Sequence, residues 1–412
     1  MKYEVSKEIV LSQVPEGPIA EHIGSFAKSL SEQGYALCSI HRQVSLAACF
    51  SGWLGRQGVV LRAITSDHPA RYLRYRARKV RLYPGDAAAL KYLLDFLRRK
   101  RLLPAEKISP RPLTSVDRYT QAYEHYLRKV RGLARATIVA YVPFIRSFLK
   151  ARFGDKTVTP SHLRGSDIVR FIRRQAPRLQ PKRAKLLTSG LRSFLQYLRF
   201  RGKIKLDLAA AVPAVANWSM SSIPRAIATD QVRRLLDSID QCSAPGRRDY
   251  AILLLLARLG LRSGEVVSLE LDDIDWNEGQ LSVRGKSGQR NHLPMSEEVG
   301  KAIAAYLRHG RPPCTSRRVF LRAKAPIRGF QGPCGIGSIV RHRLKRAGIV
   351  APTCGAHQFR HGLATDLLRQ GASLGEIGEL LGHRSPETTK IYTKVDLDAL
   401  RTLALPWPGG ER

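Results

Sequence analysis

The sequence predicts a mainly helical fold with one small antiparallel β-sheet near its C-terminal end. Apolar residues recur at helical spacing through most of the 412 residues, and proline-bearing stretches without periodicity at 102–114 and 212–224 separate three segments. Over 272–295 the pattern changes to alternation of apolar and polar residues, with turn signals at 277–279 and 286–288. We therefore expect three domains, at residues 1–105, 112–212 and 222–412.

The first two segments begin alike. A helical stretch, 19–30 in one and 116–127 in the other, leads to a glycine, and a second helix follows. We expect Ser39 and Thr137 to cap these second helices. The likeness suggests a duplicated helical module, although two unrelated helical hairpins would give the same pattern. Residues 1–105 are thus either a helical N-terminal arm or a second copy of the module in 112–212.

The third segment starts with a buried helix that we expect to break at Gly260, and a short second helix precedes the sheet. After the sheet, helical periodicity resumes six times. The expected helices are 296–307, 335–347, 357–369, 374–381, 387–394 and 397–403.

The charge balance predicts a polyanionic partner. Lysine and arginine number 70 against 33 aspartate and glutamate residues, a formal net charge of +37. Such an excess opposes compaction by self-repulsion, and nucleic acid is the leading candidate to balance it, with an anionic membrane surface as the rival. No apolar run is long enough to span a bilayer, and the first ten residues lack a signal-peptide core. We therefore expect a cytoplasmic protein, associated with the nucleoid if the polyanion is DNA.

Three basic runs, near 71–81, 98–101 and 170–185, are candidates for phosphate contacts. A single run is usually a solvated face, but three of them in a chain of this charge favour nucleic-acid binding. Such contacts position a duplex without reading its sequence. The candidate DNA-binding residues are Arg74, Arg78, Arg81, Arg173, Arg174, Lys182 and Arg183.

The six cysteines are scattered and form no C-x-x-C pair, which is typical of reduced thiols. Cys354 lies near His357, but no second pair of ligands stands at zinc spacing. We therefore expect no metal site and no cofactor.

Six side chains suited to phosphate chemistry follow one another in the third segment. Each alone has an ordinary structural explanation, such as a solvated arginine, a turn lysine or a histidine within a core, and Arg262 beside Glu265 could be a simple ion pair. Their occurrence together favours a site, and His357 and Arg360 at i and i+3 share one helical face. The six residues are Arg262, Lys286, His357, Arg360, His383 and Tyr392.

The stretches "GLRSGEVVSL", "HQFRHGLATDLL" and "LLGHRSPETTKIYTKV", together with the hairpin lysine, resemble the signature motifs of the tyrosine recombinases, also called phage-type integrases. The resemblance covers residues 224–405. Residues 112–212 are similar to the helical, SAM-like core-binding domain of that family. The resemblance implies helical DNA-binding domains followed by a mixed α+β catalytic domain.

The resemblance also implies an activity: site-specific cleavage and rejoining of DNA through a 3′-phosphotyrosine intermediate, without ATP or metal. The six residues named above would be catalytic, with Tyr392 as the nucleophile, and His361 is a common neighbour outside that set. The implied partners are double-stranded DNA with recombination half-sites and a homotetramer on synapsed DNA, alone or with related recombinases. The extra N-terminal segment favours a mobile-element recombinase.

The residue types fit phosphodiester exchange. Two guanidiniums, Arg262 and Arg360, can grip the non-bridging oxygens on which negative charge develops. His357 and His383 would add hydrogen bonds or help to take the tyrosine proton, and Glu265 would orient Arg262.

Lys286 would protonate the departing 5′ oxygen, and Arg290 or His292 on the same hairpin is the alternative acid. Two other functions remain open: a type IB topoisomerase-like enzyme that relaxes DNA, and a catalytically silent DNA-binding protein. The predicted helix at 397–403 after Tyr392 favours a recombinase over a topoisomerase, because it could dock onto a neighbouring subunit. The complete set of six residues disfavours a silent binder.

Overall fold

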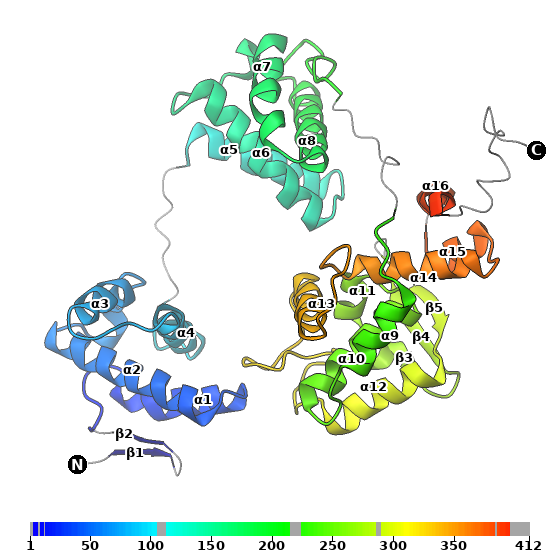
Figure 1. The fold of residues 1–412 in the computed structure, drawn as a ribbon. Coiled ribbons are helices and arrows are strands. Elements are labelled where there is room, and N and C mark those ends of the chain that lie inside the picture. Colours follow the sequence, from blue (N-terminus) through cyan, green and yellow to red (C-terminus); the bar gives the residue numbers. More distant parts are fainter. Residues whose placement is uncertain are drawn as a thin grey trace, which may run out of the picture. The chain divides into compact units, whose positions relative to one another are not determined.

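Figure 1 shows the computed structural model of the chain, which describes residues 3–6, 9–11, 13–104, 113–214, 224–285, 290–383 and 385–395. The chain divides into two compact units, residues 107–221 and the combination of 1–106 with 222–412. Separate hydrophobic cores form within residues 11–103, 116–212 and 227–359. Helices with one small antiparallel sheet in the C-terminal part confirm the predicted fold class. The division into three domains stays a prediction.

The N-terminal part begins with an antiparallel hairpin and continues with helices. Its elements are β1 (Tyr3–Ser6), β2 (Ile9–Leu11), η1 (Ala20–His22), α1 (Ile23–Glu32), α2 (Leu37–Arg56), η2 (Leu61–Ala63), α3 (His68–Ala77) and α4 (Asp86–Arg99). Tyr72 of α3 packs between Phe50 and Trp53 of α2, with ring centroids 5.2 and 5.6 Å away. The hairpin was not predicted from the sequence, because strands this short carry too little alternation to be recognised.

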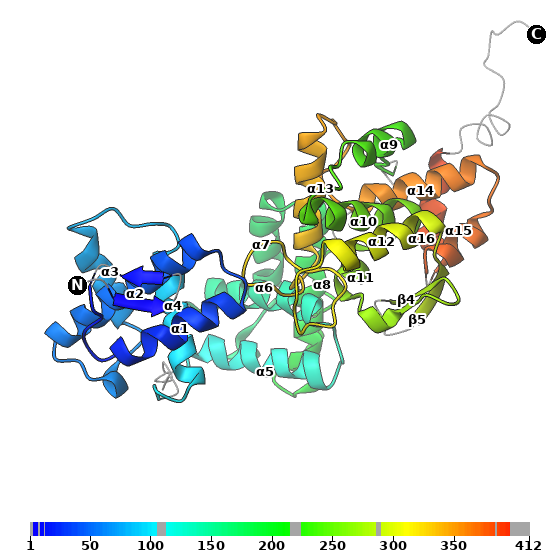
Figure 2. The same ribbon diagram turned by 90° about the horizontal axis from the view of Figure 1, so that it is seen from below.

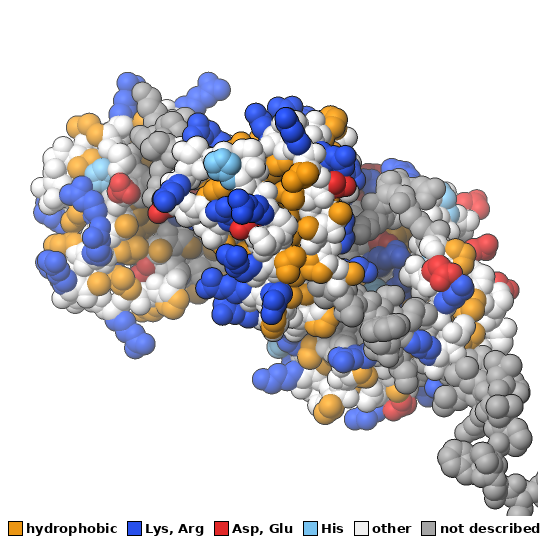
Figure 3. All heavy atoms as spheres, turned by 90° about the horizontal axis from the view of Figure 1, so that it is seen from above, with side chains coloured by type: hydrophobic (Ala, Val, Ile, Leu, Met, Phe, Trp, Pro, Cys, Tyr) orange, Lys and Arg blue, Asp and Glu red, His pale blue; other side chains and the backbone are white. Residues whose placement is uncertain are grey.

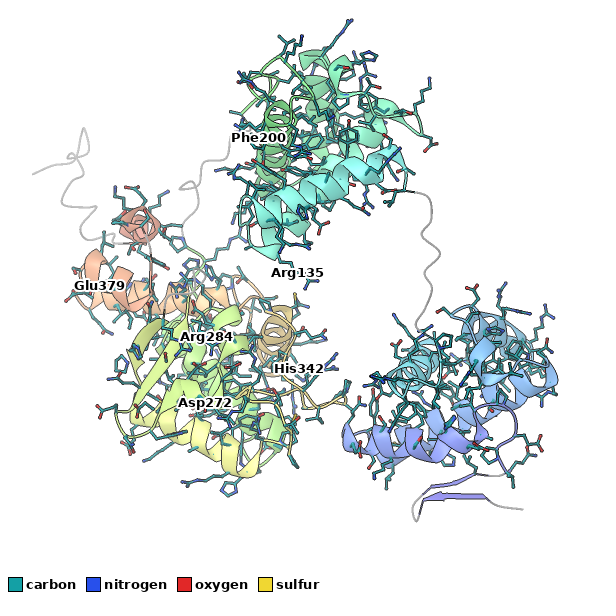
Figure 4. All side chains as sticks on the ribbon, turned by 180° about the vertical axis from the view of Figure 1, so that it is seen from behind. Arg135, Phe200, Asp272, Arg284, His342 and Glu379 are labelled. Carbon is teal, nitrogen blue, oxygen red and sulfur yellow. The ribbon has the colours of Figure 1, made fainter. Side chains whose placement is uncertain are left out.

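The middle part is a helical bundle. Its elements are α5 (Ser115–Lys129), α6 (Arg135–Phe153), η3 (Pro160–His162), α7 (Gly165–Gln175), η4 (Ala176–Arg178) and α8 (Pro181–Phe200), and Figure 4 labels the first residue of α6 and the last of α8. Helix α5 starts after Thr114, whose hydroxyl accepts a hydrogen bond from the Asp117 amide at 3.1 Å. Tyr123 of α5 packs edge-on against Phe194 of α8 at 5.1 Å.

The predicted caps of the second helices are wrong. Helices α2 and α6 begin two residues before Ser39 and Thr137, and the residues at the cap positions are Ala36 and Ala134. Both hydroxyl residues therefore lie within the first turn. The connections between the paired helices are nevertheless alike. Each contains a glycine with positive φ two residues before the cap alanine, Gly34 at +76° and Gly132 at +58°. Whether they arose by duplication stays a prediction.

The C-terminal part surrounds one buried helix, α10, which Figure 2 shows among its neighbours. Residues 251–256 of α10 are all fully buried, and the helix contacts α9, α11, α12, α13 and α14. The elements are α9 (Thr229–Asp237), α10 (Ala244–Arg258), α11 (Ser263–Ser268), η5 (Leu271–Asp273), β3 (Ile274–Asp275), β4 (Gln280–Arg284), β5 (Arg290–Pro294), α12 (Glu297–His309), α13 (Cys334–Arg346), α14 (His357–Arg369), α15 (Leu374–Leu380), α16 (Pro386–Thr389) and η6 (Lys390–Val395).

The sheet has the antiparallel order β3-β4-β5. Leu281 of β4 pairs with Ile274 on one side and Leu293 on the other, and all three side chains face the core. The last residue pair of β4 and β5 before the connecting turn is Arg284 with Arg290. Figure 4 labels Arg284, the last residue of β4, two positions before Lys286. Lys286 itself lies outside the described residues.

Most helix predictions for this part are confirmed. Helices α12 to α15 agree with the expected ranges to within two residues at either end. The helix expected at 387–394 is wrong as a single element, because α16 ends at Thr389 and a 3-10 helix continues to Val395. The β-branched residues Thr388, Thr389 and Ile391 have weak α-helical preference, which accounts for the change. The helix expected at 397–403 lies outside the described residues.

A buried charge network ties α10 to α13. Asp249 accepts hydrogen bonds from Arg248 Nε at 2.9 Å and from Arg343 Nε at 2.7 Å. Arg248 also donates to the Leu321 carbonyl at 3.1 Å and lies over the Phe330 ring. Because each of these buried charges has a partner, the network fixes how the two helices meet.

Among the described residues, no helix is long and apolar enough to cross a membrane.

Candidate active site

Arg262 is fixed by Glu265 at the start of α11. The chain leaves α10 through Gly260 at φ +59°, and Arg262 occupies the cap position of α11. The Arg262 amide donates to one Glu265 oxygen at 2.8 Å, and Arg262 Nη1 donates to the other at 2.7 Å. The arginine side chain is 35% exposed and the glutamate 9%. Glu265 thus holds Arg262 from the protein side and leaves part of the guanidinium open to a ligand.

Arg360 is buried in α14 and held by main-chain oxygens. It is 3% exposed. Its Nη1 donates to the Gly260 carbonyl at 2.8 Å, and its Nη2 donates to the Leu381 carbonyl. Burial, followed by the charge of Arg262, lowers the pKa of Arg360 to about 10. The guanidinium therefore remains charged at neutral pH, although no carboxylate bonds to it among the described residues.

His383 is a neutral histidine at the edge of the same cluster. Its Nδ1 lies 2.8 Å from the Thr389 hydroxyl. Burial lowers its pKa to about 4, and Arg360, Arg262 and His357 contribute in the same direction. Its backbone follows Gly382 at φ +58°, and a Cβ placed on that glycine would lie 2.6 Å from the Asn291 side-chain nitrogen of β5. Asn291, in the hairpin whose connecting turn contains Lys286, therefore lies against Gly382, the residue before His383.

Tyr392 lies in η6 and is 1% exposed. Its ring belongs to a small core with Ala364, Ile377 and Leu381, separate from the main core around α10. Its hydroxyl lies 3.0 Å from Nδ1 of His361. Burial raises the pKa of Tyr392, while the charges of Arg360 and Arg262 lower it to a smaller extent. The phenol is therefore protonated at neutral pH.

The structure brings together five of the six residues predicted from the sequence. The charges of Arg262 and Arg360 act on both His383 and Tyr392, and His357 acts on His383. His357 and His361 stand one turn apart on α14, with ring centroids 4.8 Å apart. Among the described residues, no group of three or more His, Cys, Asp or Glu side chains could hold a metal ion. The cluster gathers two arginine cations and hydrogen-bonding side chains, an arrangement suited to binding an anion.

His361 was not among the residues predicted for the site. We expected this residue to pack or hydrogen-bond beside the cluster, and its ring nitrogen contacts the tyrosine hydroxyl. The spacing of four residues between His357 and His361 places both on one helical face, and this was the available signal. The contact with Tyr392 joins residues 31 positions apart and has no periodic signature.

The seven predicted DNA-binding residues are all exposed. Arg74 lies in α3 with Arg78 and Arg81 after it, Arg173 and Arg174 lie in α7, and Lys182 and Arg183 lie in α8. Among the described residues none of the seven forms a salt bridge, whereas Arg128 and Arg199 of the same bundle pair with Glu124 and Asp207. On the face drawn in Figure 3, blue Lys and Arg side chains dominate over red Asp and Glu.

The sequence matches the Phage integrase family over residues 225–398 and the N-terminal SAM-like domain of phage integrases over residues 120–202. A putative integrase/recombinase of Sinorhizobium fredii is 57% identical over 409 residues, which cover 99% of this chain and 99% of that protein. The chain belongs to the phage integrase family of tyrosine recombinases. Members of this family are enzymes that cleave and rejoin DNA at specific sites, as the sequence predicted. The tyrosine recombinase XerD of Listeria monocytogenes is 34% identical over 280 residues, 66% of this recombinase and 92% of XerD.

Solved structures share the fold of this recombinase. The XerH site-specific recombinase, in a post-cleavage complex with palindromic difH DNA, superimposes with a TM-score of 0.56 at 19% identity, over 70% of this chain and 84% of XerH. The Tn1549 transposon integrase, in complex with circular intermediate DNA, gives a TM-score of 0.53 at 18% identity, over 69% and 98% of the two chains.

We predict that Gly260→Ala will damage the site. An alanine at φ +59° costs about 1–2 kcal/mol. Its Cβ would also lie 2.8 Å from the Leu381 side chain and move the carbonyl that anchors Arg360. We expect cleavage of a DNA target to slow by roughly 10–10²-fold, because the Arg360 guanidinium shifts.

Gly348→Ala is the matched control for this prediction. Gly348 has φ +64°, and a Cβ there meets nothing within 4 Å. The control should lose similar stability in thermal unfolding and keep its cleavage rate. Equal cleavage rates for the two variants would contradict the anchoring role of the Gly260 carbonyl.

Proposed function

We propose that this recombinase cleaves and rejoins double-stranded DNA through a 3′-phosphotyrosine at Tyr392, in the service of a mobile element. The observation that carries the proposal is the placement of the Tyr392 hydroxyl in the combined field of Arg262 and Arg360. Two fixed cations beside a tyrosine oxygen suit the attack of that oxygen on a phosphate, because negative charge grows on the non-bridging oxygens.

The proposed cleavage step exchanges one phosphoester for another. Tyr392 Oη forms a bond to phosphorus, the bond from phosphorus to the 5′ oxygen breaks, and the phenolic proton passes to a base. Arg262 and Arg360 stabilise the non-bridging oxygens, and His357 and His383 supply further hydrogen bonds. Because the phosphotyrosine keeps the ester energy, a 5′ hydroxyl can later attack it and restore the DNA strand without ATP.

Lys286 is our proposed acid for the 5′ oxygen. The support for this proposal is the geometry of the β4–β5 hairpin. The strands on either side of Lys286 pair last at Arg284 and Arg290, and Asn291 lies against Gly382. A lysine at that tip is close in sequence to residues that touch the segment of His383.

The proposed partners are DNA half-sites and further copies of the chain. Exposed cations without carboxylate partners among the described residues support binding to a duplex. Recombinases of the same fold have been solved on DNA, one of them described as a lambda integrase dimer bound to a core site. We extend this to a homotetramer that coordinates cleavage, with residues after Val395 docking onto a neighbouring subunit.

The link to a mobile element has its own support. The relative that matches over nearly the whole chain is described as a putative integrase/recombinase, and a transposon integrase shares the fold. Sequencing the DNA that becomes attached to Tyr392 in cells would test the link. Attachment only at one chromosomal resolution site would contradict it.

Tyr392→Phe should keep DNA affinity and abolish the covalent adduct on a nicked suicide substrate, because only the attacking oxygen is lost. The matched control is Tyr250→Phe, which removes a partly buried tyrosine hydroxyl elsewhere in the same part of the chain. The control should form the adduct at the wild-type rate. An adduct on the Tyr392→Phe variant would show that another residue is the nucleophile, and no adduct on the wild type would favour a silent binder.

Lys286→Ala should slow cleavage by roughly 10²–10⁴-fold with little change in binding. A substrate with sulfur at the bridging 5′ position should restore the rate to near that of the wild type, because a thiolate leaves without a proton. Variants at Arg262 or Arg360 should not be rescued, since they act on the non-bridging oxygens. Failure of sulfur to rescue Lys286→Ala would transfer the role of acid to Arg290 or His292.

Replacing Arg173, Arg174, Lys182 and Arg183 together by glutamine should weaken binding equally on target and unrelated DNA. The slope of log affinity against log salt should fall by about 0.9 for every phosphate that the variant no longer touches. The matched control replaces Arg128 and Arg199, whose charges already pair with carboxylates. The control should change the slope little, and weaker binding to one sequence alone would mean that the four residues read bases.

A further inference from the structure

The structure offers a candidate for the base that the cleavage step requires. A phenol must lose its proton as its oxygen bonds to phosphorus, and the burial of Tyr392 opposes early loss of that proton. The two histidines implied by the family resemblance were expected to bind phosphate oxygens or to share this proton. The geometry distinguishes His361 from His383 as the group that takes this proton.

His361 has its ring nitrogen at the reacting oxygen. Nδ1 lies 3.0 Å from Tyr392 Oη, a distance suited to transfer of a proton along a hydrogen bond. The imidazole is steadied by edge-on contacts with two rings, His357 at 4.8 Å and Tyr392 at 5.7 Å between centroids. The role of base requires the phenol to donate this bond, with the lone pair on Nδ1.

His383 is poorly placed for the same task. Its Nδ1 is occupied by the Thr389 hydroxyl at 2.8 Å. Burial and the neighbouring guanidiniums hold its pKa at about 4, so it binds a proton weakly. These features suit a neutral hydrogen-bonding group facing a phosphate oxygen and do not suit a proton acceptor.

We propose that His361 is the catalytic base for Tyr392. As Oη bonds to phosphorus, the O–H bond breaks and the proton moves to His361 Nδ1, which gives an imidazolium, while the 5′ oxygen leaves with a proton from its own acid. In rejoining, the 5′ oxygen bonds to phosphorus and gives its proton back to that acid, the bond from phosphorus to Oη breaks, and the imidazolium returns its proton to Oη. The charge that develops on the phosphate offsets the cost of a further cation beside Arg262 and Arg360.

The test combines variants at position 361 with a more acidic tyrosine. His361→Ala removes the base, and His361→Asn keeps a hydrogen-bond acceptor near the place of Nδ1 but cannot bind a proton. Each variant is made in the full-length protein with either tyrosine or 3,5-difluorotyrosine at position 392. Single-turnover cleavage is measured on the nicked suicide substrate, and DNA affinity and thermal unfolding report on folding.

With ordinary tyrosine, both variants should bind DNA normally and cleave about 10²–10⁴-fold more slowly than the wild type. With difluorotyrosine, the ratio of wild-type to variant rate should shrink by about tenfold or more, since the acidic phenol needs less help from a base. Arg262→Ala should keep its full penalty with both tyrosines, because its role concerns the non-bridging oxygens.

Two outcomes would overturn the inference: a wild-type rate for His361→Asn, or an equal penalty with both tyrosines in a variant that thermal unfolding shows to be folded. His361→Asn covers the case in which the alanine variant fails to fold. The inference rests on the proposed function, and the two can fail separately. If Tyr392 is not the nucleophile, the Tyr392→Phe variant still forms the covalent adduct. If only the base is misassigned, the Tyr392→Phe variant forms no adduct, and the decrease in cleavage rate of the variants at position 361 is the same with tyrosine and difluorotyrosine.

Discussion

The buried guanidinium of Arg360 joins the three segments that make the site. One of its nitrogens donates to the Gly260 carbonyl, at the break between α10 and α11, and another donates to the Leu381 carbonyl, at the end of α15. Arg262 follows the first carbonyl by two residues, and His383 follows the second by two. A shift of Arg360 therefore moves both of these side chains. Because the acceptors are main-chain oxygens, the arrangement depends on backbone path, which explains why a left-handed glycine stands at position 260.

Charge repulsion is the cost of this arrangement, and it appears at two scales. Within the site, the pKa of Arg360 is lowered to about 10 and that of His383 to about 4, with burial as the main cause and neighbouring cations contributing to both. Glu265 engages Arg262, but its carboxylate is turned to the protein side. Across the chain, the net charge of +37 also means that positive charges repel one another. The negative charge of a DNA phosphate would reduce the repulsion within the site and across the chain. Part of the free energy of binding DNA would therefore come from this reduction in repulsion.

The sequence predicted the helices with strong periodicity better than it predicted local detail. Helix α14 was expected at its observed bounds, because a full set of apolar positions marks it. The prediction that Ser39 and Thr137 are helix caps was wrong. The sequence alone does not distinguish a hydroxyl residue within the first turn of a helix from one at the cap position. The contact between His361 and Tyr392 could not be predicted, because the fold of α15 and η6 brings the tyrosine to this histidine. Lys286, by contrast, was predicted from the hairpin pattern and the family motifs, and its position lies outside the described residues.

Tyr392, the proposed nucleophile, is also one of the four buried residues that hold η6 and α15 on α14. This small core is separate from the large one around α10. An element secured by few apolar contacts opens at a lower free energy than the whole domain. We therefore expect mild heating to release η6, and Tyr392 with it, before most helices unfold. Loss of activity and loss of helical signal would then be two transitions, and a melting temperature read from helix content would overstate the range in which the enzyme can act.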